Sequence, residues 1–201
     1  MRPRGFLIWA GVLMAIGLPL ALAAFSPQLA WRQPIYIASS FAGIAALTLL
    51  LIQPLLIAGL LPGIAKPAAR RIHKVVGGSL LIAVLAHVGG LWITSPPDVV
   101  DALLLVSPTP FSLWGVLAMW AVFASAFLAV FWKRLGLRWA TWRTVHLGLA
   151  TVIVGGTVAH ALLIEGVMEN VSKIVLCALV ALVALKVIVE WQGRFRRASP
   201  D

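Results

Sequence analysis

Charged residues, acidic ones above all, are scarce in this sequence. Only 11% of its 201 residues are charged and only 6 are acidic, while 62% are hydrophobic and the mean hydropathy is +1.03. Soluble domains carry about 25% charged residues, so this composition excludes a soluble globular protein. A crossing of the ~30 Å hydrocarbon core takes roughly 20 apolar residues, and the length therefore allows at most about seven spans. We predict an integral membrane protein.

Motifs of soluble catalytic domains are also missing. The sequence contains no G-x-G-x-x-G, no G-x-x-x-x-G-K-S/T and no H-E-x-x-H. Its single cysteine, Cys177, lies in an apolar run, which excludes an internal disulfide and a cysteine metal cluster and favours a small hydrophobic role. The net charge of +10 resides between apolar runs, as in cytoplasmic loops beside anionic lipid, and this favours membrane lipid over nucleic acid as the partner.

Six apolar runs are each long enough to cross a membrane as a helix. We therefore predict an all-α fold, a six-transmembrane-helix bundle that forms a single domain over residues 1–201. Pro54 is expected to bend or end the second helix. Residues 2–24 resemble a secretory signal peptide, but their apolar stretch exceeds the usual ~7–15 residues, and this favours an uncleaved first helix. The predicted helices are 5–25, 35–61, 72–94, 111–132, 142–164 and 171–191.

Basic residues alternate between loops in a way that predicts the orientation. Of the loop-proximal lysines and arginines, only Arg32 and Lys173 fall on one side of the membrane, and all the others fall on the other side. The positive-inside rule then puts both termini in the cytoplasm and predicts a multi-pass protein of the inner (plasma) membrane. Asp98, Asp101 and Glu169 accordingly lie on the outer side.

All four histidines lie in the third and fifth predicted helices, and both pairs are spaced by 14 residues: His73 with His87, and His146 with His160. Fourteen residues fall only about 40° short of four helical turns and advance the helix by ~21 Å, so each helix presents two histidines on nearly one face. The two helices run in the same direction. His73 is therefore expected level with His146, and His87 with His160.

Two facing imidazoles at each of two depths suit two six-coordinate b haems with axial histidines. A zinc site would need three or four ligands at one level, and none is offered beyond the pair. For any single intramembrane histidine, an interhelical hydrogen bond explains the residue equally well. Two equally spaced pairs at matching depths are much harder to explain in that way.

Small and basic residues flank the histidines. Gly77, Gly90 and Gly156 lie three or four residues from a histidine, where a missing side chain lets a flat macrocycle approach, although ordinary helix packing predicts glycines too. Arg71 and Arg143 are placed to meet the propionates of the cytoplasmic haem, as are Arg70 and Lys74, although positive-inside charges would stand at the same places.

The most specific motifs in the chain are Arg70-Arg71-Ile72-His73-Lys74-Val75-Val76-Gly77 with His87, and Leu135-Gly136-Leu137-Arg138-Trp139 before His146 and His160. Through these motifs the chain resembles the ferric reductase-like transmembrane domain family, which includes ferric reductases, NADPH oxidases and the bacterial haem-binding subunit of a periplasmic methionine sulfoxide reductase system. The resemblance implies two stacked haems, with His73 and His146 binding one and His87 and His160 the other. The flavin and nicotinamide domains of the larger members do not follow the sixth helix.

The function implied is transmembrane electron transfer by a haem-binding subunit of an oxidoreductase. The donor would be a cytoplasmic flavin reductase or a quinol, so flavin or quinone enters through a partner, and the acceptor would be a periplasmic reductase or ferric chelate. Two alternatives stay open. One is a quinol- or ascorbate-linked cytochrome b of another family, and the other is a cofactor-free transporter or scaffold.

Overall fold

The computed structural model describes residues 3–198, with side chains described as far as residue 193, and its regular structure is helical throughout. Six of the helices are long and apolar enough to cross a membrane. This agrees with the predicted six-span membrane bundle. The elements are α1 (Pro3–Ala24), a 3-10 turn (Pro27–Leu29), α2 (Pro34–Ile57), α3 (Lys66–Thr94), α4 (Pro96–Leu103), α5 (Pro110–Phe131), α6 (Trp139–Leu163) and α7 (Asn170–Ala198).

The observed helices differ most from the predicted runs in three places, one of which is the end of α7, which extends to Ala198 where the prediction ended at 191. Helix α2 ends at Ile57, three residues after Pro54, and α3 already begins at Lys66, so the turn between them is displaced toward the N-terminus. Apolarity alone misplaced this turn, because Leu60 and Leu61 continue the hydrophobic run beyond the helix. The segment 95–110, predicted as a loop, contains the short helix α4 at its start.

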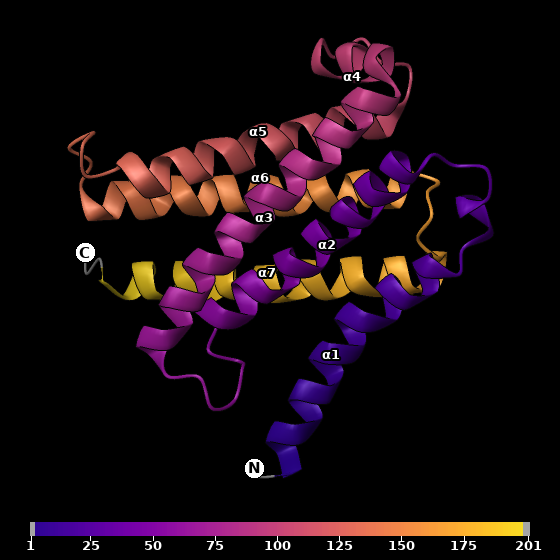
Figure 1. Ribbon diagram of the computed structural model, residues 1–201. Coiled ribbons are helices and arrows are strands. Elements are labelled where there is room, and N and C mark those ends of the chain that lie inside the picture. The colour runs from indigo at the N-terminus through magenta and orange to yellow at the C-terminus, as the bar shows by residue number, and fades with distance from the viewer. Residues whose placement is uncertain (1–2, 199–201) are drawn as a thin grey trace.

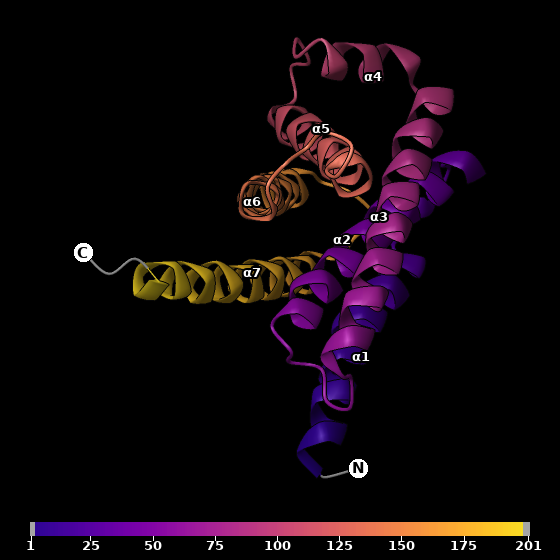
Figure 2. The ribbon, with the colours of Figure 1, turned by 90° about the vertical axis from the view of Figure 1, so that its left-hand side faces the viewer.

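Two helical hairpins, α2–α3 and α5–α6, dominate the arrangement. Helices α5 and α6 run side by side, α7 passes beneath α6 at an angle that Figure 2 shows, and α2 and α3 run obliquely to both (Figures 1 and 2). Helix α4 lies at the end of the molecule where α3 passes over to α5 (Figure 1). Since α3 and α6 each follow the first helix of a hairpin, both run in the same direction through the bundle.

Glycine closes both hairpin turns. After α2, the N–H of Leu60 donates to the carbonyl of Leu55 and that of Gly59 to Leu56, with Gly59 at a φ of 66°. The turn after α5 repeats this pattern around Gly136, which has a φ of 64°. A residue with a side chain strains in this left-handed conformation, so glycine at these positions favours a sharp reversal of the chain.

The main hydrophobic core packs α7 against α2. Leu176, Cys177 and Val180 on α7 are at most 1% exposed and pack in one cluster with leucines of α2 such as Leu47 and Leu51. Cys177 is thus a buried small hydrophobe, as its apolar neighbours predict. This packing holds α7 against α2.

Candidate functional site

The four histidines meet in two pairs between α3 and α6. The ring centroids of His73 and His146 are 6.4 Å apart, and those of His87 and His160 are 6.5 Å apart. These are the pairs that equal depth predicts. The imidazole planes within the pairs cross at 77° and 79°.

The spacing within each pair suits a single metal ion between the rings. Two metal–nitrogen bonds of about 2 Å, each extended by roughly 1.1 Å to the ring centre, place the centroids about 6.2 Å apart. Among the described residues, no group of three or more His, Cys, Asp or Glu could hold a bare metal ion. The donor set at each level therefore fits a metal whose remaining ligands come from a macrocycle, as in haem.

Backbone carbonyls of the neighbouring helices orient the second pair. The Nδ1–H of His87 donates to the carbonyl of Ser39 on α2 at 2.8 Å, and that of His160 donates to the carbonyl of Phe111 on α5 at 2.9 Å. A carbonyl only accepts, so each of these rings carries its proton on Nδ1. The lone pair of Nε2 is then free for a metal, and the hydrogen bond fixes the ring's rotation.

The first pair is held less completely. Nδ1 of His146 lies 3.0 Å from the hydroxyl of Ser125 on α5. The backbone of Gln53 on α2 faces His73 without reaching hydrogen-bond geometry. Within the described part of the chain, the buried side-chain atoms that lack a partner are Gln53 Oε1, His73 Nδ1 and Trp142 Nε1, and Trp142 stacks on His146. Buried polar atoms usually find partners, so these orphaned atoms support a further polar group at this level.

The supporting residues repeat the spacing of the histidines. Ser39 and Gln53 are 14 residues apart on α2, and Phe111 and Ser125 are 14 apart on α5. Each hairpin thus combines a helix that carries two histidines with a helix that faces both of them. Sequence reasoning missed these four residues, because Ser39, Gln53 and Phe111 face the histidines with backbone atoms, which carry no side-chain signal.

Two glycines that sequence reasoning also missed lie directly against the histidines. A Cβ on Gly43 would come within 2.9 Å of His87 Nδ1, and a Cβ on Gly115 within 2.6 Å of His160 Nδ1. Real Cβ atoms essentially never approach so closely. Glycine at these positions lets α2 and α5 bring their carbonyls to the imidazoles.

The predicted glycines contact neighbouring helices. A Cβ on Gly90 would lie 2.7 Å from Ser39 Cβ, one on Gly156 would lie 2.9 Å from the Trp114 carbonyl, and one on Gly77 would lie 3.1 Å from Gln53 Nε2. Close helix packing accounts for all three contacts. An additional contact of Gly77 and Gly156 with a macrocycle stays a prediction.

The predicted basic residues lie at the surface. Arg71 and Arg143 are exposed, and each lies within three residues of a histidine of the first pair. Arg70 and Lys74 are exposed as well. Their interaction with propionates stays a prediction, and Arg2 of the same predicted basic side lies outside the described residues.

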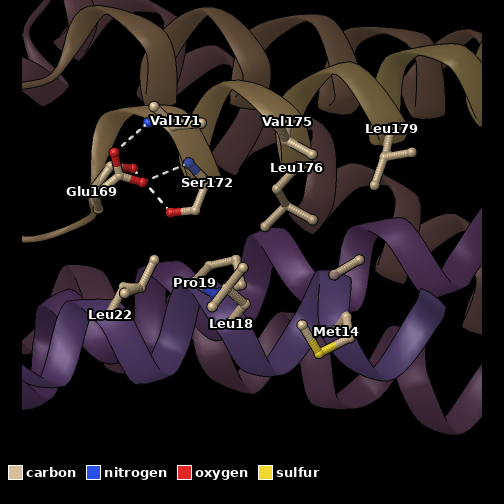
Figure 3. A pocket seen from close by; sticks show the side chains of 11 residues that line it. Met14, Leu18, Pro19, Leu22, Glu169, Val171, Ser172, Val175, Leu176 and Leu179 are labelled. Atoms are coloured by element: carbon tan, nitrogen blue, oxygen red, sulfur yellow. Dashed lines mark hydrogen bonds between the residues drawn. The ribbon is translucent and has the colours of Figure 1, made fainter. Parts of the chain in front are cut away.

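An apolar groove of about 190 Å³ lies elsewhere, between α1 and α7. Leu18 and Leu22 line it from α1, and Val175 and Leu179 from α7 (Figure 3). Glu169 at its end already accepts the N–H groups of Val171 and Ser172, both at 2.7 Å (Figure 3). No histidine lines the groove, so it is separate from the paired imidazoles.

Fold and site together define a class, a six-span helical membrane protein with two intramembrane histidine pairs. The family model described as "Ferric reductase like transmembrane component" matches residues 40–157, which is more than half of the chain. The chain belongs to this family, as the sequence motifs indicate. The match includes His73, His87 and His146, and His160 follows it by three residues. No curated protein and no solved structure matches the chain. Membership implies haem-mediated transmembrane electron transfer in general.

Proposed function

We propose that this chain carries single electrons across the membrane through two b haems. His73 and His146 would hold one haem, and His87 and His160 would hold the other. The observation that carries the proposal is the pair of matched imidazole separations, 6.4 and 6.5 Å, on helices that run in the same direction. Family membership supports the same chemistry.

Haem iron between two imidazoles supplies reversible one-electron oxidation and reduction. The protein's contribution is to fix the orientation and the tautomer of the histidine side chains. The carbonyls of Ser39 and Phe111 keep His87 and His160 in the tautomer whose Nε2 binds metal, and Ser125 holds His146 by its Nδ1. Because the chain would supply two imidazoles to each haem iron, no position on the iron would remain open to a substrate. This favours electron relay over binding and activation of a substrate.

The first pair lies toward the end of α3 and α6 where basic residues gather. Arg71 and Arg143 would pair with haem propionates, since guanidinium groups donate well to carboxylates, and Gly77 and Gly156 would give a macrocycle room. By the positive-inside rule this end faces the cytoplasm. Electrons would then enter from a cytoplasmic flavoprotein or a quinol and leave toward a periplasmic reductase or ferric chelate, which makes the chain an electron-transfer subunit of an oxidoreductase.

Single histidine variants test the ligation. His73→Ala and His146→Ala should each remove the first haem, and His87→Ala and His160→Ala the second, because loss of one axial ligand leaves the iron five-coordinate in a site shaped for two. Redox difference spectra of the purified variants, with haem per polypeptide, measure the effect. Wild-type protein without haem would contradict the proposal, as would loss of the same haem from the His73 and His160 variants.

A further inference from the structure

A column of aromatic rings leads from the surface to the first histidine pair. Trp139, Trp142 and His146 follow one another on α6 at spacings of three and four residues, which place them on one helical face. The Trp139 and Trp142 rings stack with centroids 4.6 Å apart at 24°, and the Trp142 and His146 rings lie nearly parallel, 5.4 Å apart at 9°. Each ring contacts the next without an intervening residue.

The end of this column at the protein surface is exposed to solvent and lies beside a basic residue. Trp139 is 57% exposed, and Trp132, from the turn after α5, contacts both Trp139 and Trp142 with centroids 5.7 and 5.5 Å away. The ammonium group of Lys133 lies over the Trp132 ring, 5.7 Å from its centre. The three tryptophans, here named the indole cluster, thus join an exposed ring to a proposed haem ligand.

An interfacial aromatic belt explains only part of this arrangement. Belt tryptophans keep their apolar body in lipid and turn the indole N–H toward water. Nε1 of Trp142 is instead buried, and no partner for it lies among the described residues. The ring face of Trp142 also stacks on the imidazole of His146 and does not lie against lipid. Its position therefore relates to His146 and not to the headgroup layer.

We propose that the indole cluster is the path by which electrons enter the first haem. A reduced flavin at the cytoplasmic surface gives up two electrons, one at a time, and becomes oxidised flavin with release of two protons to water. Each electron would cross by way of Trp139, Trp142 and His146 to the first haem. The first electron would pass on to the second haem before the next arrives, so that the two electrons would reduce one ferric iron at each level. The indoles bridge the distance and undergo no net change. This inference rests on the function proposed above.

Stopped-flow reduction by reduced flavin mononucleotide tests the path. The variants are Trp142→Leu, Trp142→Phe and Trp139→Leu. Trp120→Leu is the matched control, since Trp120 is 56% exposed on α5 and its ring contacts Phe123. Haem content, the midpoint potentials and the total reduction by dithionite are measured for each protein. The protein is inserted into vesicles that flavin mononucleotide does not cross. Molecules of the two orientations then expose opposite faces to the added flavin, and their reduction gives two kinetic phases.

One phase should slow in Trp142→Leu by about tenfold, which corresponds to about 1.4 kcal/mol in activation free energy. Trp139→Leu should slow the same phase, Trp142→Phe should retain most of the rate, and Trp120→Leu should match wild type. Haem content and potentials should stay unchanged in Trp139→Leu and Trp142→Phe. Wild-type rates in both leucine variants would overturn the inference. If Trp142→Leu loses haem, its rate cannot be used. A wild-type rate in Trp139→Leu would then be sufficient to overturn the inference. Colourless wild-type protein would instead overturn the proposed function.

Discussion

At the scale of single residues, the second histidine pair depends on backbone atoms of α2 and α5 and on two glycines that let those helices come close. The groups that hold the second pair are the backbone carbonyls of Ser39 and Phe111, and any residue type offers a carbonyl. Gly43 and Gly115 had no visible role, because their contacts depend on how closely α2 and α5 approach the histidines.

Substitution of Gly115 should disturb the second histidine pair. In Gly115→Ala the new Cβ would lie 2.6 Å from His160 Nδ1, so the ring must move and its hydrogen bond to Phe111 must lengthen. We expect partial or complete loss of one of the two haems, seen in haem content and the difference spectrum. Gly155→Ala is the control, since nothing lies within 4 Å of its new Cβ and alanine in a helix gains about 0.5–1 kcal/mol. Equal haem content in the two variants would contradict this role of Gly115.

At the scale of elements, the two hairpins are related to each other. Ser39, Gln53, His73 and His87 of the first are followed after 72 or 73 residues by Phe111, Ser125, His146 and His160 of the second. The sequence shows this repeat only in its histidines, because the supporting residues differ in type and act partly through backbone atoms.

Helix α4 was not predicted from the sequence. Its eight residues are too few for a span, and its two leading prolines favour a turn as readily as a helix start.

The start of α7 depends on an acidic cap. Ser172 and Val171 donate backbone N–H groups to the exposed Glu169 carboxylate, and these bonds hold its pKa below the ordinary value of 4.5. A lowered folded-state pKa means that the cap stabilises the protein above pH 4.5 and is lost as the pH falls through the lowered value. Glu169→Gln should therefore lower the Tm in detergent at pH 7, and the difference from wild type should vanish at low pH. Glu165→Gln is the control, because Glu165 is another exposed carboxylate in the same loop. A pH-independent difference would exclude this titration as its cause.

At the scale of the whole molecule, hydropathy and basic residues predict the number of spans and their direction, while the crossing of the hairpins came only from the structure. Apolar runs are local properties and could be read directly. The oblique course of α2 and α3 relative to α5 and α6 depends on the packing of side chains distant in the sequence (Figures 1 and 2). Trp139 and Trp142 illustrate the difference, since each fits an interfacial belt when considered alone and forms a stack only once the fold is known.

The orientation can be measured with reporter fusions. Fusions after Ala198 or within 133–139 should report cytoplasm, and those near Asp98 or Glu169 should report the exterior, because nearly all basic loop residues lie on one side. An external C-terminus would reverse the direction of electron flow proposed here. It would leave the parallel course of α3 and α6 unchanged. Cleavage after Ala23 would remove α1 and leave the other five spans as placed.

The source of electrons is the property on which the whole molecule's role depends. The 201 residues contain no dinucleotide fingerprint, so this chain should not take hydride from a nicotinamide. Its basic face could attract an acidic flavoprotein by electrostatic steering, and a quinol could reach the same depth through lipid. The purified protein should therefore stay oxidised with NADPH alone and become reduced when a flavin reductase with its nicotinamide, or a quinol, is added. Absorbance of the reduced haem bands under anaerobic conditions follows both reactions.

The rate of flavoprotein-dependent reduction should fall with rising salt, because salt screens the attraction between the two protein surfaces. The rate of quinol-dependent reduction should not fall, because a quinol does not dock through surface charge. Direct reduction by NADPH would show that the chain is more than a relay subunit.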